Sequence, residues 1–338
     1  MKAEWAQVHI GFEKTGSTTI QRFLGVNHAR LKQSGVLYPL AAGRPSQANL
    51  PAAVMEDGRV ERMRARLGLT SDEALATFRD RFRADLTVEV EAARPRTLLF
   101  SHENLSTRLR PPEIARLHDF LGDFAERVTI LAYVRRQDEL PMSLYSTAVL
   151  GGRAEPFAWP EPDAAPGWFD YHPILCAWRD AFGAENLQVR RYGRRYFTDK
   201  DLLADLAQAL GLPSGLEPAP RLNSGFDLQR LEFVRLLNGV TGGQADPRWH
   251  ALARRLHDTS EGPGLGASRR RRKAFAAAFE ESNRKVARDF LGLDGPLFDH
   301  PFPNNPPPRG PWLTPEAAVG LAAELLEPQA AEGAKKPD

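Results

Sequence analysis

A continuous run of apolar residues, VTILAYV at 128–134, constrains the fold more than any other feature of the chain. A strand that is apolar on both faces is typical of a parallel sheet with helices on both sides. Further strands are expected at 8–12, 97–101 and 187–192, and each is followed by a stretch with helical periodicity. This alternation predicts an α/β fold, namely a P-loop-like three-layer domain with a mostly parallel central sheet and a helical C-terminal part.

Composition narrows the class of protein. The chain has 338 residues, 42% of them hydrophobic, which suffices for one large domain or two modest ones. A formal net charge of +2 gives no global attraction to nucleic acid or membrane surfaces, and a single cysteine, Cys176, cannot form an internal disulfide bond. The N-terminus lacks a signal-peptide pattern, and no apolar run approaches the roughly 20 residues that cross a bilayer. We expect a cytoplasmic protein with no integral membrane segment and no nucleic-acid partner; its oligomeric state stays open.

The first expected strand leads into the sequence GFEKTGSTT, in which Gly11 and Gly16 have the spacing of a nucleotide-binding P-loop. A P-loop has Lys and then Ser or Thr after the second glycine, whereas Ser17 follows here and the lysine is Lys14. Backbone N–H groups at the start of the next helix, the hydroxyl groups at 17–19 and the Lys14 charge suit a phosphate or sulfate group. The alternative is a surface lysine next to hydroxyl groups that only cap a helix.

The apolar run at 128–134 ends in Arg135 and Arg136. A P-loop nucleotide hydrolase would have an acidic residue near the end of such a strand to help hold Mg²⁺. Ser143 follows eight residues after Arg135, about two turns into the next expected helix. The strand end therefore favours a second phosphate group over a metal ion, although a pair of solvated arginines is the usual interpretation when such a pair stands alone.

Taken together, these stretches resemble the sulfotransferases that depend on 3′-phosphoadenylyl sulfate (PAPS), in particular bacterial members similar to carbohydrate sulfotransferases. HIGFEKTGSTTIQRFL resembles their 5′-phosphosulfate loop, and VTILAYVRRQDELPMSLY resembles their 3′-phosphate element. LQVRRYGRRYFTDKDLLADLAQALGL is similar to a third stretch of the family. The resemblance implies a sulfotransferase domain at 1–300, with a PAPS-binding core at about 5–212 and a helical part at 222–292. A proline-rich linker, a short helix and a disordered tail are expected at 301–338.

The resemblance also implies roles for single residues. Lys14 would contact the phosphosulfate and stabilise the charge on the bridging oxygen as the S–O bond breaks. Arg135 and Ser143 would hold the 3′-phosphate, and Tyr192 would lie near the adenine. The 5′-phosphate would be held by backbone and hydroxyl groups of Thr15, Gly16, Ser17, Thr18 and Thr19. In the family an acidic pair and a leucine often follow the tyrosine, whereas GRRYF follows Tyr192.

Transfer to a hydroxyl group needs a base that takes the acceptor proton. Members of the family often carry Ser-x-Glu-x-Leu after the second strand, and SHENLS in this chain makes Glu103 the expected base. His102 is the alternative because an imidazole titrates near neutral pH. Neighbours at a strand end point to opposite sides, so we expect only one of the two to reach the site. His9 lies inside the first strand and is expected to pack, and Asn49 stands in a loop where similar proteins often have a histidine.

The expected activity is in-line transfer of a sulfuryl group from PAPS, as co-substrate, to a hydroxyl group of a carbohydrate or another small molecule, without a metal. Two alternatives stay open: a P-loop-type nucleotide-dependent kinase, and a non-catalytic module that binds nucleotides or polyanions. The basic run SRRRRK at 268–273 could contact the 3′-phosphate, bind an anionic acceptor, or form a solvated helix face. Trp159, Trp168 and Phe169 could stack on sugar rings or only pack, and the sequence does not identify the acceptor.

Overall fold

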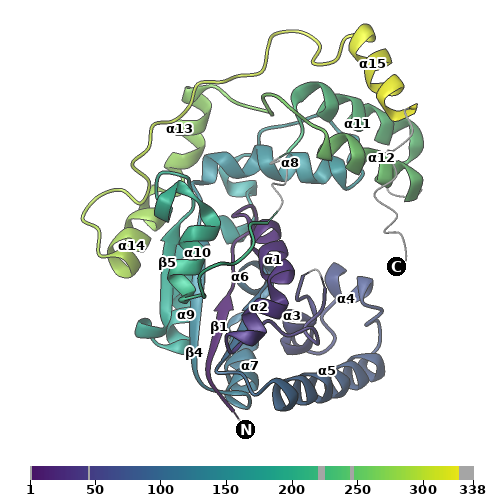
Figure 1. Ribbon diagram of the computed structural model, residues 1–338. Helices are drawn as coiled ribbons and strands as arrows, with labels where there is room; N and C mark the ends of the chain where they lie inside the picture. Colours follow the sequence, from purple (N-terminus) through teal and green to yellow (C-terminus); the bar gives the residue numbers. More distant parts are fainter. Residues whose placement is uncertain (1, 45, 220–224, 244–246, 327–338) are drawn as a thin grey trace. The chain divides into compact units, whose positions relative to one another are not determined.

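The computed structural model describes residues 2–44, 46–219, 225–243 and 247–326 (Figure 1). The chain forms two compact units, each built from several segments. The first comprises Met1–Arg136, Ala165–Arg221 and Ala278–Asp299, and the second comprises Gln137–Ala164, Leu222–Ala277 and His300–Asp338. Whether 1–300 folds as one domain stays a prediction, and the tail expected to be disordered lies largely outside the described residues.

The first unit contains a sheet whose five strands, in the described part of the chain, are all parallel. Their order is β2-β3-β1-β4-β5. The strands are β1 (Ala3–His9), β2 (Val36–Leu37), β3 (Thr97–Ser101), β4 (Ala125–Val134) and β5 (Leu187–Arg191). His9 pairs in register with Ser101 and with Leu131, so the carboxyl ends of β1 and β3 lie side by side. The predicted α/β fold with a parallel central sheet is confirmed.

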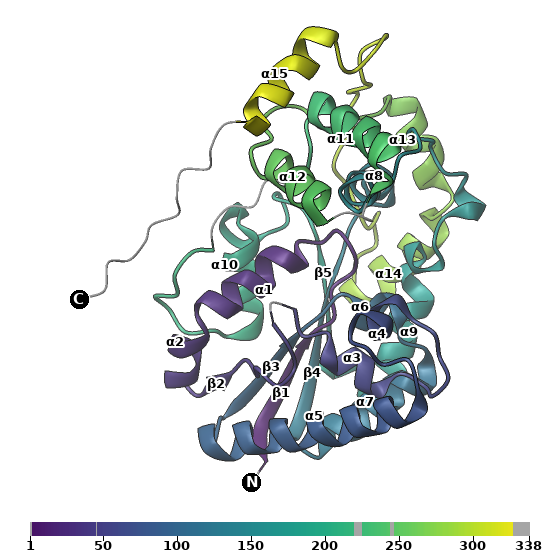
Figure 2. The same ribbon diagram turned by 90° about the vertical axis from the view of Figure 1, so that its right-hand side faces the viewer.

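One face of this sheet is covered by α1 (Ser17–Val26), α2 (His28–Gln33) and α10 (Leu202–Leu210), as Figure 2 shows. Their apolar side chains form one buried cluster with residues of β3 and β4, including Leu99, Leu131 and Tyr133. The start of α10 follows from its sequence, since the Asp201 side chain accepts hydrogen bonds from the first turn, and Gly211 ends the helix in the left-handed conformation.

The opposite face carries α7 (Pro111–Gly122), α9 (Tyr171–Phe182) and α14 (Glu280–Leu291). α5 (Asp72–Ala93) packs against α3 (Asn49–Val54) and begins at Ser71, whose hydroxyl accepts a hydrogen bond from the Ala74 N–H. α4 (Arg62–Arg66) and α6 (Asn104–Arg108) are single short turns. With helices on both faces, the first unit has the three layers that the buried strands predicted.

The second unit, in its described residues, is helical. It contains α8 (Leu140–Leu150), α11 (Leu228–Thr241), α12 (Pro247–Asp258), α13 (Arg269–Ala277) and α15 (Pro315–Leu326). Its core joins Tyr145 and Val149 of α8 to Leu231 and Val234 of α11 and to Leu321 of α15. Pro141 lies in the first turn of α8, where a missing N–H costs no helical hydrogen bond. Among the residues that the structure describes, no helix is both long and apolar enough to cross a membrane.

Two local expectations differ from the structure. The first strand, expected at 8–12, is Ala3–His9, because the chain leaves the extended conformation just before Gly11, which has a φ of 48°. Ile10 and Phe12 are nevertheless fully buried, which explains the apolar run that suggested a strand there. Asn49, expected to stand in a loop, is instead the first residue of α3. Five of the six α3 residues are buried, so tertiary packing stabilises a helix that local sequence does not favour.

Candidate functional site

The turn between β1 and α1 has a backbone that few residues adopt. Gly11, Lys14 and Gly16 have φ values of 48°, 68° and 81°. Lys14 is not glycine, and a left-handed backbone costs such a residue roughly 1–2 kcal/mol. A turn that alternates hands directs successive backbone N–H groups to one side, as in anion-binding nests. Strain at this position is therefore consistent with a built anion site.

The hydroxyl groups of the turn differ in whether they already make hydrogen bonds within the protein. The Thr15 hydroxyl closes the turn, since Oγ1 donates to the Phe12 carbonyl at 2.6 Å and accepts from the Phe12 N–H at 3.2 Å. Ser17 is buried, and its Oγ has no hydrogen-bond partner among the described residues. Thr18 is exposed and Thr19 is half-buried at the start of α1. The predicted hydroxyl donors thus differ: Thr15 holds the turn together, while Ser17 still has a hydrogen bond to make.

α1 presents an uncapped N-terminus to this turn. Its N-cap is Gly16, no side chain caps the helix, and no acidic residue lies in its first turn. The first backbone N–H groups of a helix lack partners within it and carry partial positive charge. A Cβ at position 16 would collide with the Leu202 side chain and would lie 3.4 Å from Cε2 of Tyr192. Glycine is required there by both its φ and its neighbours.

Arg135 and Tyr192 meet the turn within the first unit. Nη1 of Arg135 donates to the Lys14 carbonyl at 2.8 Å. The Arg135 guanidinium lies over the Tyr192 ring, 5.2 Å from its centroid. Tyr171 fixes the backbone here, because its hydroxyl donates to the Arg135 carbonyl at 2.6 Å. The structure thus brings together three of the residues predicted from separate motifs, namely Lys14, Arg135 and Tyr192.

Lys14 lies in a partly buried position among charged groups of both signs. Burial lowers its pKa, and the neighbouring Arg135 charge lowers it further. Glu13 and Glu103 oppose this shift through their negative charges. The ammonium group is therefore less solvated than that of a surface lysine and lies beside another cation, so an incoming anion would stabilise its charged form.

Glu103 follows β3 and is half-buried. Its Oε2 accepts a hydrogen bond from Nε2 of Gln21 at 3.0 Å, and Gln21 also donates to the Ser101 carbonyl at 3.3 Å. Gln21 lies on α1, so one amide joins the carboxylate to the helix that begins at the turn. The electrostatic interaction with Lys14 places Glu103 in the same neighbourhood.

His102 has a different environment. It is 4% exposed, and burial lowers its pKa, so the ring is neutral near pH 7. Its Nδ1 accepts a hydrogen bond from the Asn104 backbone N–H at 3.0 Å. Because a backbone N–H can only donate, the proton of the neutral ring is on Nε2. A ring in this state has no free basic nitrogen, which favours Glu103 over His102 as a base.

Sequence patterns did not single out three polar residues near the turn. Burial raises the pKa of Glu13, and the positive charge of Arg108 lowers it in part. Nη2 of Arg108 lies 3.0 Å from Oε1 of Glu13. Gln47 is fully buried, and its Oε1 accepts from the Ser101 backbone N–H at 2.8 Å. Gln21 holds Glu103. The burial of Gln21 and Gln47 is a tertiary property with no local sequence signal, although Glu13 was visible beside Lys14.

Other predicted residues lie in the second unit or in the core. Ser143 is half-buried on α8 of the second unit. In the basic run, Arg272 is buried, and its Nη1 lies 3.0 Å from Oδ2 of Asp138 and its Nη2 2.9 Å from Oδ1 of Asn305. The other four basic residues of the run are exposed. One arginine of the run is therefore structural, and whether the four exposed residues bind an anion or only face solvent stays a prediction.

The tryptophans of the loop at 152–170 pack against other aromatic rings. Trp168 and Phe169 are 7% and 1% exposed, with ring centroids 4.6 Å apart. Trp159 packs edge-on against Phe275 in the second unit at 5.7 Å. Trp168 and Phe169 therefore belong to the core of the first unit and present little surface to a sugar.

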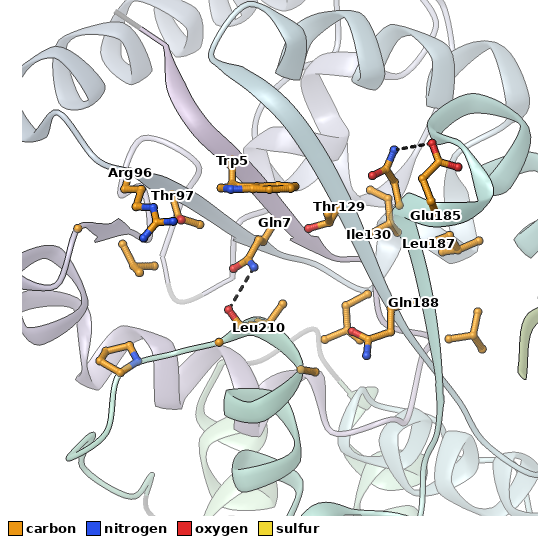
Figure 3. A pocket seen from close by; sticks show the side chains of 18 of the residues that line it. Trp5, Gln7, Arg96, Thr97, Thr129, Ile130, Glu185, Leu187, Gln188 and Leu210 are labelled. Atoms are coloured by element: carbon orange, nitrogen blue, oxygen red, sulfur yellow. Dashed lines mark hydrogen bonds between the residues drawn. The ribbon is translucent and has the colours of Figure 1, made fainter.

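A hollow of about 750 Å³ also opens on the first unit. Figure 3 shows Trp5 and Gln7 of β1 beside Thr129 of β4 and Gln188 of β5. Nε2 of Gln7 donates to the Leu210 carbonyl at 3.1 Å, where α10 ends. The glycine turn follows the carboxyl end of β1, whereas Trp5 and Gln7 lie further back along that strand. Ligands of open parallel sheets bind beyond the carboxyl ends, so the hollow is a different place from the candidate site.

The chain is similar to a curated protein and to a solved structure. No family model matches the chain. A protein of Archaeoglobus fulgidus described as an uncharacterized protein is 29% identical over 185 residues, which are 53% of this chain and 50% of that protein. The chain thus spans about half the length of this curated relative. A solved sulfotransferase domain from the curacin biosynthetic pathway is similar with a TM-score of 0.40 and 12% identity, over 82% of this chain and 97% of that domain. A structural similarity of this size carries no conclusion about function.

Proposed function

We propose that the protein is a PAPS-dependent sulfotransferase that transfers a sulfuryl group to an acceptor hydroxyl, of a carbohydrate or another small molecule. The observation that carries the proposal is the contact between two motifs predicted separately to bind the two ends of the donor. Arg135, from the end of β4, donates to the carbonyl of Lys14 in the glycine turn. Arg135, the glycine turn and the Tyr192 ring lie next to one another, which supports the proposal of a donor with two phosphate ends and a base.

The turn supplies what a phosphosulfate needs. Backbone N–H groups at the start of α1 and the Ser17 hydroxyl would hold the 5′-phosphate. Lys14 would neutralise charge beside the bridging oxygen, and its pKa is lowered by burial and by the neighbouring Arg135 charge. Arg135 would hold the 3′-phosphate, and Tyr192 would lie near the adenine. Ser143, on α8 of the second unit, stays the proposed partner of Arg135 on the sequence resemblance alone.

The reaction would proceed by displacement at sulfur. Glu103 takes the proton of the acceptor hydroxyl, and the acceptor oxygen forms a bond to sulfur. The bond between sulfur and the bridging oxygen breaks, and its electron pair leaves on 3′-phosphoadenosine 5′-phosphate (PAP). Lys14 stabilises that developing charge, which is the kind of electrostatic stabilisation that dominates group transfer. Gln21 would orient the Glu103 carboxylate, since it donates to Oε2 at 3.0 Å.

The proposed reaction does not use a metal ion. Arg135 and Arg136 directly follow β4, near the position where a nucleotide hydrolase has an acidic residue. Among the described residues, no group of three or more His, Cys, Asp or Glu side chains could hold a metal ion. That no metal takes part stays a prediction, and an assay with and without a chelator addresses it.

A transfer assay tests the proposal. PAPS labelled with sulfur-35 is incubated with a panel of sugar and phenol acceptors in the presence of EDTA. We expect labelled product from the wild type and from the control Lys32→Ala, which removes an exposed lysine of α2. We expect transfer to be roughly 10²–10³-fold slower for Lys14→Ala, as when one donor to a developing oxyanion is removed. Transfer that requires a divalent metal, or that Lys14→Ala leaves intact, would contradict the mechanism.

A further inference from the structure

Two buried polar atoms beside Gly11 lack hydrogen-bond partners among the described residues. They are Nε2 of His9, at the end of β1, and Oγ of Ser17, the first residue of α1. His9 is fully buried and Ser17 is 6% exposed. A Cβ built on Gly11 would lie 2.9 Å from Oγ of Ser17 and 3.5 Å from Nε2 of His9. Both atoms therefore lie next to the position that a side chain at residue 11 would occupy.

The His9 ring is fixed by its other nitrogen and by packing. Nδ1 lies 2.8 Å from Oγ of Ser101, and the ring packs edge-on against Tyr133 with centroids 5.9 Å apart. Burial lowers the pKa of His9 to about 4, so the ring carries one proton near pH 7. The Ser101 hydroxyl is able to donate to Nδ1, and the ring proton is then on Nε2. His9 would in this way hold an N–H donor against the turn.

The groups around Nε2 of His9 and Oγ of Ser17 favour an anionic oxygen beside Gly11. The Ser106 hydroxyl donates to the Gly11 carbonyl, so the nearby backbone acceptor already has a donor. The uncapped N-terminus of α1 adds partial positive charge, with no acidic residue in its first turn. A buried polar atom without a partner is destabilising, so two such atoms next to Gly11 call for a ligand oxygen or an ordered water.

We propose that Nε2–H of His9 and Oγ–H of Ser17 form an oxyanion niche that binds one oxygen of a phosphate or sulfate group. His9 is then a positioning residue of the glycine turn, a role that the sequence did not suggest. For the proposed sulfotransferase, on which this identification of the ligand rests, the oxygen belongs to the 5′-phosphosulfate of PAPS. An ordered water is the competing occupant.

Nuclear magnetic resonance tests the niche in the wild-type protein. In protein labelled with ¹⁵N-histidine, we expect His9 to be neutral with its proton on Nε2. Addition of PAP or of inorganic phosphate is expected to shift the Nε2–H proton and to protect it from exchange with solvent. The resonance is assigned by its loss in His9→Gln, and the exposed ring of His118 serves as the internal control.

Calorimetric titration with PAP gives the second readout. Removing the donor of a hydrogen bond to a charged group weakens binding roughly 10- to 100-fold. We expect a loss of PAP affinity of this size for His9→Leu and for Ser17→Ala. His9→Gln keeps an N–H donor near the position of Nε2 and is expected to recover most of the affinity. Circular dichroism establishes that each variant is folded, and the labelled wild type decides the matter if His9→Leu is not.

The outcomes separate the niche from the proposed function. If PAP binds but the His9 resonance does not move and His9→Leu binds normally, the niche holds only water and the proposal of the niche is wrong. If PAP does not bind while inorganic phosphate shifts the His9 resonance, the niche stands and the sulfotransferase proposal fails. If neither ligand binds, both are overturned.

Discussion

Acidification gives a quantitative test of the buried His9 ring. The ring is fully buried, and the cost of desolvating a cation lowers its pKa from 6.5 to about 4; the negative charge of Glu103 opposes this only in part. The unfolded chain therefore takes up a proton at a higher pH than the folded chain does. His9 contributes no pH dependence above pH 6.5; between there and pH 4 stability falls as pH is lowered, and below pH 4 the loss is complete.

The size of the effect follows from the shift. At 1.36 kcal/mol per pH unit, a pKa lowered from 6.5 to about 4 corresponds to roughly 3 kcal/mol of unfolding free energy lost across this window. Several carboxylates whose pKa is lowered, such as Asp205, also lose stabilisation on acidification, so the wild type alone cannot isolate the histidine. The matched variant His9→Gln lacks the titrating group and leaves the carboxylates unchanged.

Urea unfolding at pH 7, 5.5 and 4 measures this difference. Circular dichroism follows unfolding, and hydrogen exchange of β1 peptides reports on the first unit separately. At pH 7 we expect His9→Gln to be less stable than the wild type, because the interaction of Nδ1 with Ser101 is lost. The unfolding free energy of the wild type minus that of His9→Gln is expected to fall by roughly 3 kcal/mol from pH 7 to pH 4, far enough for the order of the two stabilities to reverse. A gap that is the same at all three pH values would refute the assignment of a buried, neutral His9.

Three other predictions concern the site and its support. Glu103→Gln keeps the shape that accepts from Gln21, yet we expect turnover to fall roughly 10²–10⁴-fold, whereas His102→Gln stays within tenfold of wild type; the reverse order in a transfer assay would assign the base to the histidine. The pKa of Lys14 lies below its ordinary value of 10.5, so Lys14 loses its charge, and PAP affinity is expected to weaken, at a lower pH than for a surface lysine. Titrations of Lys14→Ala at the same pH values are expected to lack this decrease in affinity. Asp205 accepts from Arg190 at 2.5 and 2.7 Å while 1% exposed, so Asp205→Asn is expected to destabilise the first unit by roughly 3 kcal/mol in urea unfolding; a change below about 1 kcal/mol would contradict a tight buried pair.

Much of the fold could be predicted because its signals are local. β3 is Thr97–Ser101 as expected, because a continuous apolar run marks it, and the short helix expected within 301–338 is α15 (Pro315–Leu326). β1 was placed too late because Ile10 and Phe12 are buried without being in a strand. α3 was missed because burial, rather than helix propensity, stabilises it.

In the candidate site, too, the sequence identified residues that belong to local motifs and missed properties that depend on tertiary structure. Lys14 and Arg135 could be found because each belongs to a motif at a strand end, and parallel strands bring such ends to one edge. The state of His102 could not be found, because it depends on a single hydrogen bond from the Asn104 backbone. The orphaned Nε2 of His9 likewise follows only from the path of the chain around Gly11.

Nucleotide preference tests the central claim most directly. Calorimetric titration of the wild-type protein compares PAP in the presence of EDTA with ATP in the presence of Mg²⁺, and repeats both with Lys14→Ala and the control Lys32→Ala. A sulfotransferase site predicts PAP binding without metal, clearly tighter than ATP with Mg²⁺, weakened by Lys14→Ala and unchanged by Lys32→Ala. Preference for ATP with Mg²⁺ would contradict the proposed function and would favour a nucleotide-dependent kinase.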